Sequence, residues 1–256
     1  MNPTICYLIC CTQRCGSNFI ASGLINSKIA GNPNEFFVDH VRKVLGVDYD
    51  MLEINRLITE TMTPNGVFGV RIMWRTFLEL IDKLQQDSRY KEMSAAKIMS
   101  TIFPNLHYIY LTRKDKVRQA ISYSKARQTN EYYQTIDGKT VGHPTRTPTD
   151  KLKFRFKEIH RYANNFFKQD ENWRQYFRDN DVNTFSVIYE NLVEKYEQTI
   201  IELLKYMKIE IPDEKIQIQS HLVKQADSIS DKWVRKYHRR AKLYNSIKPL
   251  LKPLKP

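Results

Sequence analysis

Cysteine is scarce in this sequence and absent beyond position 15. The four cysteines stand at positions 6, 10, 11 and 15 of a 256-residue chain. They cannot link distant segments by disulfides, so a reduced compartment fits best. They form no Cys-x-x-Cys pair, and the first histidine is His40. No metal site is predicted, because small buried strand residues are the simpler interpretation.

The sequence also lacks long apolar runs and flexible linkers. The longest early apolar run, 5–11, is too short to cross a bilayer, and no basic segment precedes it as in a secretory signal. No Pro-, Gly- or Ser-rich stretch divides the chain, and a hydrophobic content of 41% suffices for a full core. We therefore expect one domain over 1–256, without a membrane span and located in the cytoplasm.

Acidic residues are missing from the C-terminal end. None occurs after Asp231, while lysine and arginine recur as far as Lys255, and the whole chain has a formal net charge of +13. Such a charge indicates an anionic partner: nucleic acid, a membrane surface, an acidic polysaccharide or a phosphorylated co-substrate. The basic tail, 239–256, is most simply a solvated helix with a frayed end. Charge alone does not choose among these partners.

Short apolar runs alternate with helix-like segments along the chain. Buried strands are expected at four places: 4–11, 67–74, 106–112 and 184–189. This alternation predicts an α/β fold with a central, mainly parallel sheet flanked by helices.

Two longer segments have a different character. Aromatic residues recur at roughly helical intervals over 149–178, and we expect them in the core rather than in a base-stacking surface. The stretch 129–148 is polar and contains Gly138, Gly142 and Pro144. It is predicted to be a long loop that serves as a lid.

A polar loop joins the first expected strand to the first expected helix. It reads Thr12-Gln13-Arg14-Cys15-Gly16-Ser17-Asn18, and the helix is expected to start at Asn18. A loop in this position directs backbone N–H groups and the positive end of the helix dipole at an anion. Gly16 permits close approach, Arg14 adds a permanent charge, and Ser17 and Asn18 add side-chain donors. On its own, the loop is equally consistent with an ordinary turn and helix cap.

The loop does not match the nucleoside-triphosphate pattern GxxxxGK[ST], because it lacks the lysine and the first glycine. Gly138-Lys139-Thr140 would end such a pattern elsewhere in the chain. Tyr133 stands where its first glycine should be, however, and no apolar strand precedes it. A Walker-type site is therefore not predicted.

A second anion site is indicated where the strand 106–112 ends. Arg113 follows this strand, and Ser122 lies nine residues further on, in the next expected helix. Carboxyl ends of neighbouring parallel strands share one edge of a sheet, so both anion sites would face one crevice and suit a bisphosphorylated nucleotide. For Arg113 taken alone, a surface ion pair is the alternative.

Motifs spread along the chain carry a family resemblance. They are TQRCGS at 12–17, AGNPNEFF at 30–37, TPNGVFGVRIMW at 63–74, QAISY at 119–123, ARQT at 126–129, KQA at 224–226 and SDKW at 230–233. Over roughly residues 4–238 the chain resembles the trehalose 2-sulfotransferase-like family of bacterial sulfotransferases. The resemblance implies a P-loop-like fold, 3′-phosphoadenosine-5′-phosphosulfate (PAPS) as sulfuryl donor, 3′-phosphoadenosine 5′-phosphate (PAP) as product, and a homodimer.

The resemblance also implies residue roles. The 5′-phosphosulfate would bind to the loop residues Arg14, Cys15, Gly16, Ser17 and Asn18. The 3′-phosphate would bind to Arg113 and Ser122, and further donor contacts would come from Lys224 and Gln225. The family usually has serine at position 15 and threonine at position 18, so at these two positions backbone contacts transfer rather than hydroxyl contacts. Glu35 matches the family's proposed general base.

The expected chemistry is in-line transfer of a sulfuryl group to an acceptor hydroxyl, without a metal. Loop N–H groups and Arg14, with Arg71 as a further candidate, would stabilise charge on the leaving phosphate. Glu35 would accept the acceptor's proton, and His40 is the second candidate base. Acceptor contacts are expected from Glu35, Phe36, Asp39, His40, Trp74 and the loop 129–148.

Alternatives from other classes remain at this point. One is a nucleotide-dependent kinase, which the missing Walker lysine and the lack of a magnesium-binding carboxylate near the loop disfavour. The other is a basic module without catalytic activity that binds a polyanion, which the charge favours. We expect a small-molecule or glycan acceptor and no nucleic acid. Cys15 is expected to be the most reactive thiol, because it stands at a helix N-terminus.

Overall fold

The computed structural model describes residues 2–37, 51–134, 140–141, 151–212, 216–220 and 228–247. Its main sheet has four strands in the order β2-β1-β3-β6, all of them parallel. Their bounds are β1 (Ile5–Cys11), β2 (Val67–Met73), β3 (Leu106–Thr112) and β6 (Thr184–Ile188). Each agrees with its expected range to within one residue. The prediction of an α/β fold with a parallel sheet flanked by helices is confirmed.

The central strand β1 is apolar on both faces because helices cover both. Alternate residues of β1 face opposite sides of the sheet. Cys6, Leu8 and Cys10 belong to one apolar cluster, whereas Tyr7 and Ile9 belong to the other. A continuous apolar run, rather than an alternating one, is what a doubly covered parallel strand requires.

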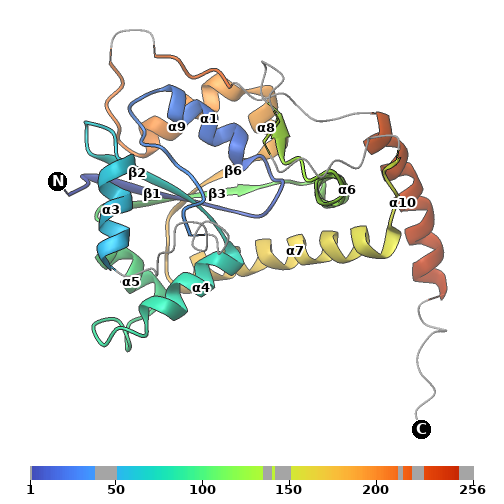
Figure 1. The fold of residues 1–256 in the computed structure, drawn as a ribbon, viewed down its shortest axis with the longest axis horizontal. Helices are drawn as coiled ribbons and strands as arrows, with labels where there is room; N and C mark the ends of the chain where they lie inside the picture. The colour runs from blue at the N-terminus through green and yellow to red at the C-terminus, as the bar shows by residue number, and fades with distance from the viewer. Residues whose placement is uncertain are drawn as a thin grey trace. The chain divides into compact units, whose positions relative to one another are not determined.

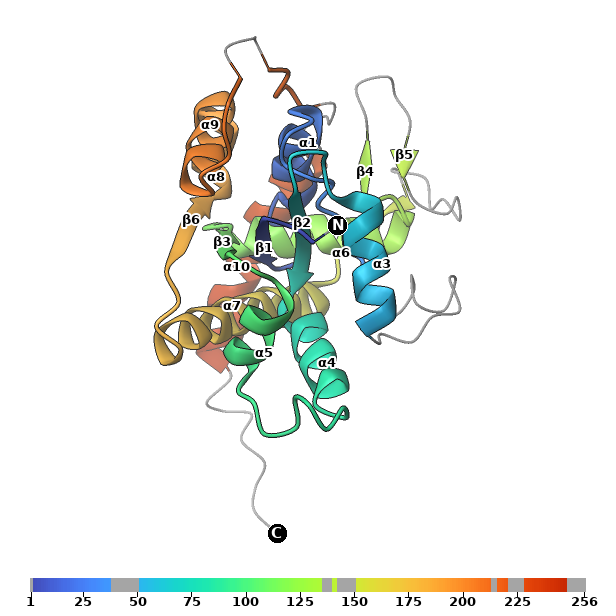
Figure 2. The same ribbon diagram turned by 90° about the vertical axis from the view of Figure 1, so that its left-hand side faces the viewer.

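Different helices cover the two faces, as Figures 1 and 2 show. On one face lie α1 (Ser17–Asn26), α8 (Tyr189–Glu194) and α9 (Tyr196–Tyr206), which contribute to one apolar cluster. The other cluster contains residues of α3 (Met51–Thr61), α4 (Trp74–Leu84), α5 (Ala95–Ile102) and the C-terminal part of α7 (Phe156–Asp179). The aromatic stripe over 149–178 supplies buried core residues, including Trp173 and Phe177, as expected.

The chain divides into two compact units, each with its own core. The first comprises 1–114 and 168–221 and contains the four-stranded sheet. The second comprises 115–167 and 222–256. It contains α6 (Lys116–Thr129), α10 (Ser228–Ile247) and a small antiparallel sheet of β4 (Tyr133–Gln134) and β5 (Thr140–Val141). The predicted single domain over 1–256 stays a prediction.

Within the second unit, α6, α10 and the first part of α7 share a core that includes Ile121, Phe166 and Trp233. Of the predicted lid 129–148, Thr129 ends α6, and residues 135–139 and 142–148 lie outside the described residues. Of the predicted tail 239–256, residues 239–247 belong to α10. In the part of the chain that the structure describes, no helix has the length and apolarity needed to cross a membrane.

Candidate active site

The loop between β1 and α1 is a tight turn that contains two residues with left-handed backbone angles. Arg14 and Gly16 both have left-handed backbone angles, with φ of 63° and 99°. A Cβ atom on residue 16 would lie 2.4 Å from Cδ2 of Tyr189. Two features therefore require glycine at position 16: the left-handed backbone angle and the Tyr189 ring that packs against the residue.

The N-terminus of α1 differs from those of two other helices. Ser94 caps α5 by accepting from Lys97 N, and Asp115 caps α6 by accepting from Arg118 N. Among the described residues no side chain caps α1, and its first turn contains no acid. The first N–H groups of a helix have no partner within the helix, and they lie at the positive end of its dipole. An anionic ligand can satisfy such groups. In the described part of the chain, the starts of α4, α8 and α9 also lack a side-chain cap, so this feature alone does not single out α1.

Arg113 lies beside this loop, at the carboxyl end of β3. Its Nη1 donates to the carbonyl oxygen of Arg14 at 3.4 Å, and its guanidinium carbon lies 4.5 Å from the centroid of the Tyr189 ring. Its Nε is 3.9 Å from Oε1 of Glu190, the partner that the ion-pair alternative required. Glu190 also accepts from Lys114 N at 3.0 Å. The guanidinium is therefore held against the loop from two sides, and is not a freely moving surface cation.

Arg71 is a buried arginine on β2, an edge strand of the sheet, and connects the loop helix to the segment 33–35. Only 7% of the residue is exposed. Its Nη1 contacts Asn18 Oδ1, and it also lies 3.5 Å from Ser17 Oγ. Its Nη2 donates to Asn34 Oδ1 at 2.9 Å, and its Nε donates to the carbonyl oxygen of Pro33 at 3.2 Å. One guanidinium thus fixes the start of α1 relative to the turn that precedes Glu35.

Glu35 lies within this same network. Its Oε1 is 3.3 Å from Nη1 of Arg71, and its side chain is 28% exposed. The backbone of the preceding residue bridges to β2: Arg71 N donates to the carbonyl oxygen of Asn34 at 3.0 Å. The pKa of Cys11, at the end of β1, is raised by its hydrogen bond with Cys15, by burial, and to a smaller extent by the negative charge of Glu35.

The sequence was compared with protein families and with known proteins. A family model described as "Stf0 sulphotransferase" matches residues 6–240. The chain belongs to this family. It is therefore an enzyme of the sulfotransferase class, and the resemblance identified in the sequence is confirmed.

Two curated relatives span nearly the whole chain. The trehalose 2-sulfotransferase of Mycobacterium tuberculosis (strain ATCC 35801 / TMC 107 / Erdman) is 25% identical over 264 residues, covering 92% of this chain and 95% of the relative. That of Mycolicibacterium smegmatis is 24% identical over 269 residues, with coverages of 94% and 96%. A solved sulfotransferase from Alicyclobacillus acidocaldarius is 11% identical with a TM-score of 0.49, over 97% of this chain and 96% of that chain. The assignment of the chain to its family does not rest on this structural similarity.

The aromatic residues expected to contact the acceptor of this sulfotransferase lie largely in packing positions. Phe36 stacks on Phe68 with ring centroids 6.5 Å apart, and Phe37 is buried. Trp74, half-buried at the start of α4, meets the edge of Trp173 at 4.9 Å. Acceptor contacts from Phe36 and Trp74 stay predictions.

The described structure does not determine where the remaining predicted site residues lie relative to the loop. Ser122 lies on α6 in the second unit, whereas the loop and Arg113 belong to the first. Asp39, His40, Lys224 and Gln225 lie outside the described residues. Their roles stay predictions from the family resemblance.

Tyr189 and Glu190 contact the site but were absent from the expected set. They follow β6 directly and begin α8. The rule that ligands bind beyond the carboxyl ends of parallel strands applies to β6 as it does to β1 and β3. That rule, applied to the predicted strand 184–189, would have identified them.

The expectation that Cys15 is the most reactive thiol is not supported by its position. Cys15 is fully buried, as are Cys6, Cys10 and Cys11, and it packs in the apolar cluster below α1. A helix N-terminus activates a thiol only where a reagent reaches it.

We therefore expect slow thiol labelling in the native protein. At pH 8, Ellman's reagent should modify none of the four cysteines within minutes and all of them after denaturation. Burial raises the pKa of Cys6 to about 12 and also raises that of Cys10. The hydrogen bond with Cys15, followed by burial, raises the pKa of Cys11. These three thiols therefore stay protonated at pH 8. One rapidly labelled thiol that PAP protects would restore the original expectation for Cys15.

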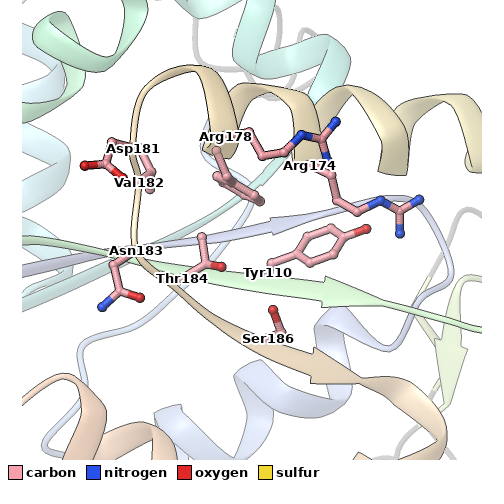
Figure 3. A pocket seen from close by; sticks show the side chains of 9 residues that line it. Tyr110, Arg174, Arg178, Asp181, Val182, Asn183, Thr184 and Ser186 are labelled. Atoms are coloured by element: carbon pink, nitrogen blue, oxygen red, sulfur yellow. The ribbon is translucent and has the colours of Figure 1, made fainter.

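A cavity of about 640 Å³ lies away from the loop, between the strands β3 and β6 and the C-terminal end of α7. Figure 3 shows Tyr110, Thr184 and Ser186 on the strands, and Arg174 and Arg178 on the helix. Arg174 forms an ion pair with Glu171, and Arg178 donates to Gln175 at 2.7 Å. Both arginines are therefore engaged along α7, and no residue of the loop or of the Arg71 network lines this cavity.

Proposed function

We propose that this sulfotransferase transfers a sulfuryl group from PAPS to a hydroxyl of a carbohydrate or a related acceptor. The observation that supports this best is the uncapped start of α1, with Arg113 clamped on one side of the loop and Arg71 tied to Ser17 and Asn18 on the other. Both mycobacterial relatives are named for the 2-sulfation of trehalose, which makes a trehalose-like disaccharide the first acceptor to test.

The residues present fit a phosphosulfate. Gly16 permits the left-handed turn before α1, the first turn of α1 contains no acid, and Arg14 belongs to the same loop. We assign the 5′-phosphosulfate to residues 14–18. Arg113 is the candidate for the 3′-phosphate, with Ser122, Lys224 and Gln225 as further candidates from the resemblance. Buried or half-buried guanidinium groups suit this task because they bind anions bidentately and stay charged.

In the reaction, PAPS supplies the activated sulfuryl group. The acceptor oxygen forms a bond to sulfur while the bond from sulfur to the 5′-phosphate oxygen breaks, and PAP leaves with the electron pair. The N–H groups at the start of α1, together with Arg14, stabilise the charge that develops on the phosphate. Glu35 accepts the proton of the attacking hydroxyl.

Arg71 couples these two tasks. It contacts Asn18 in the first turn of α1 and Oε1 of Glu35 with the same nitrogen, Nη1. The base and the anion-binding turn therefore share one rigid partner, which holds the reacting groups in a fixed relation.

Donor binding tests the proposal most directly. PAP should raise the melting temperature of the protein more than an equal concentration of ATP does, because a ligand that binds only the folded state stabilises it, by about 2.7 kcal/mol at 100 times its Kd. Transfer of radiolabelled sulfate from PAPS to trehalose would then establish the acceptor class. A larger shift with ATP would favour a nucleotide-dependent kinase and overturn the proposal.

A further inference from the structure

Two residues of α7 contact the ends of the two strands that carry the donor-binding groups. We propose that Asp170 and Trp173 act as positioning residues: they fix the carboxyl ends of β3 and β1, and through Thr112 they hold Arg113 in place for donor binding. The inference rests on the proposed function, because it takes PAP as the ligand of the loop.

Asp170 fixes the end of β3. Its Oδ2 accepts a hydrogen bond from Oγ1 of Thr112, the last residue of that strand. Asp170 is 1% exposed, and its contact with the half-buried Thr112 is part-buried. Thr112 precedes Arg113 directly, and Arg113 donates to the carbonyl oxygen of Arg14 and lies over the Tyr189 ring. The path from α7 to the loop therefore runs through Thr112, the last residue of β3, and Arg113, which follows it.

Trp173 fixes the end of β1. Its Nε1 donates to the carbonyl oxygen of Cys11 at 3.2 Å, and Cys11 is the last residue of β1 before the loop. Trp173 is fully buried and also meets Trp74, the residue that follows β2, with ring centroids 4.9 Å apart. Residues three apart lie on the same face of a helix, so one face of α7 contacts the ends of adjacent strands.

The chemistry of Asp170 argues for more than packing. An apolar side chain would cover the sheet without the cost of burying a carboxylate, and a negative charge near an anion site opposes the binding of that anion. A hydrogen bond is directional where apolar contact is not. The carboxylate therefore suits a position where the orientation of the strand end matters more than its stability.

Calorimetric titration with PAP tests the inference on the full chain. Thr112→Val removes the hydroxyl at almost constant volume and should weaken PAP binding by roughly five- to twentyfold, which is part of the free energy that one hydrogen bond to a charged group contributes. Thr112→Ser keeps the hydroxyl and should stay within about twofold of the wild type. When Thr112→Val is added to an Arg113→Lys protein, it should weaken PAP binding by less than a further twofold. The reason is that the effects of two residues on binding are not additive when one acts through the other.

Variants of Asp170 distinguish the effect of its hydrogen bond with Thr112 on PAP binding from the effect of its negative charge. Asp170→Asn keeps an oxygen that accepts the hydrogen bond from Thr112 and should retain most of the affinity for PAP. Asp170→Ala should weaken PAP binding as much as Thr112→Val does. The double variant should bind PAP little more weakly than either single variant. A Thr112→Val protein that melts lower but binds PAP as tightly as the wild type would overturn the inference, as would full additivity with Arg113→Lys. A wild-type protein that does not bind PAP would instead refute the proposed function.

Discussion

Replacing Glu35 with glutamine should lower turnover by roughly 10²- to 10⁴-fold, the usual contribution of a general base. Glutamine has nearly the same shape and can still contact Arg71, but it does not accept the proton of the attacking hydroxyl. PAP affinity should change little, since Glu35 is not assigned to the donor. The measurement is the initial rate of sulfate transfer from PAPS to trehalose, alongside the Kd for PAP.

A matched control is available on α4. Glu79 also pairs with an arginine, because its Oε1 lies 2.7 Å from Nε of Arg75, but this pair lies on the surface. Glu79→Gln should leave both turnover and PAP affinity unchanged, as removal of an exposed ion pair usually does. If Glu35→Gln turns over at a near-normal rate, Glu35 is not the base, and His40 becomes the next residue to test.

The strands and the donor loop were predictable because their signals are local. A doubly covered parallel strand needs a largely apolar sequence. β1 is a continuous apolar run, and the apolar residues of β2 and β3 are interrupted by Arg71 and His107 respectively. The loop between β1 and α1 was visible because a glycine-containing polar segment directly follows such a run. Its tie to Arg113 followed from the parallel order of β1 and β3, which brings their ends together.

The contacts that organise the site were not predictable, because they join residues far apart in the sequence. Arg71 reaches Asn18 and Asn34 across 53 and 37 positions, and Trp173 reaches Cys11 across 162. No local pattern distinguishes Arg71 from an arginine that ends in solvent. For Cys15, the place at a helix N-terminus was visible in the sequence and the burial was not, so the expected reactivity of this thiol stays a prediction.

Arg71→Lys should be the most damaging conservative change in the site. Lysine keeps the positive charge but not the planar fork that contacts Asn18, Asn34 and Glu35 together. We expect kcat/KM to fall by roughly 10²- to 10³-fold, because a displaced base and a displaced anion-binding turn both raise the barrier. The free energy of unfolding should fall by about 2–4 kcal/mol, since buried hydrogen-bonding groups lose their partner.

Arg75→Lys provides the control, because Arg75 follows four residues later and its side chain is 82% exposed. That variant should match the wild type in kcat/KM and in urea denaturation. If Arg71→Lys lost stability but kept its rate per folded molecule, the guanidinium would serve only to pack β2 against the segment 33–35. Loss of rate with PAP affinity intact would place its effect on Glu35, whereas loss of both would mean that Arg71 joins the base and the donor loop into one unit.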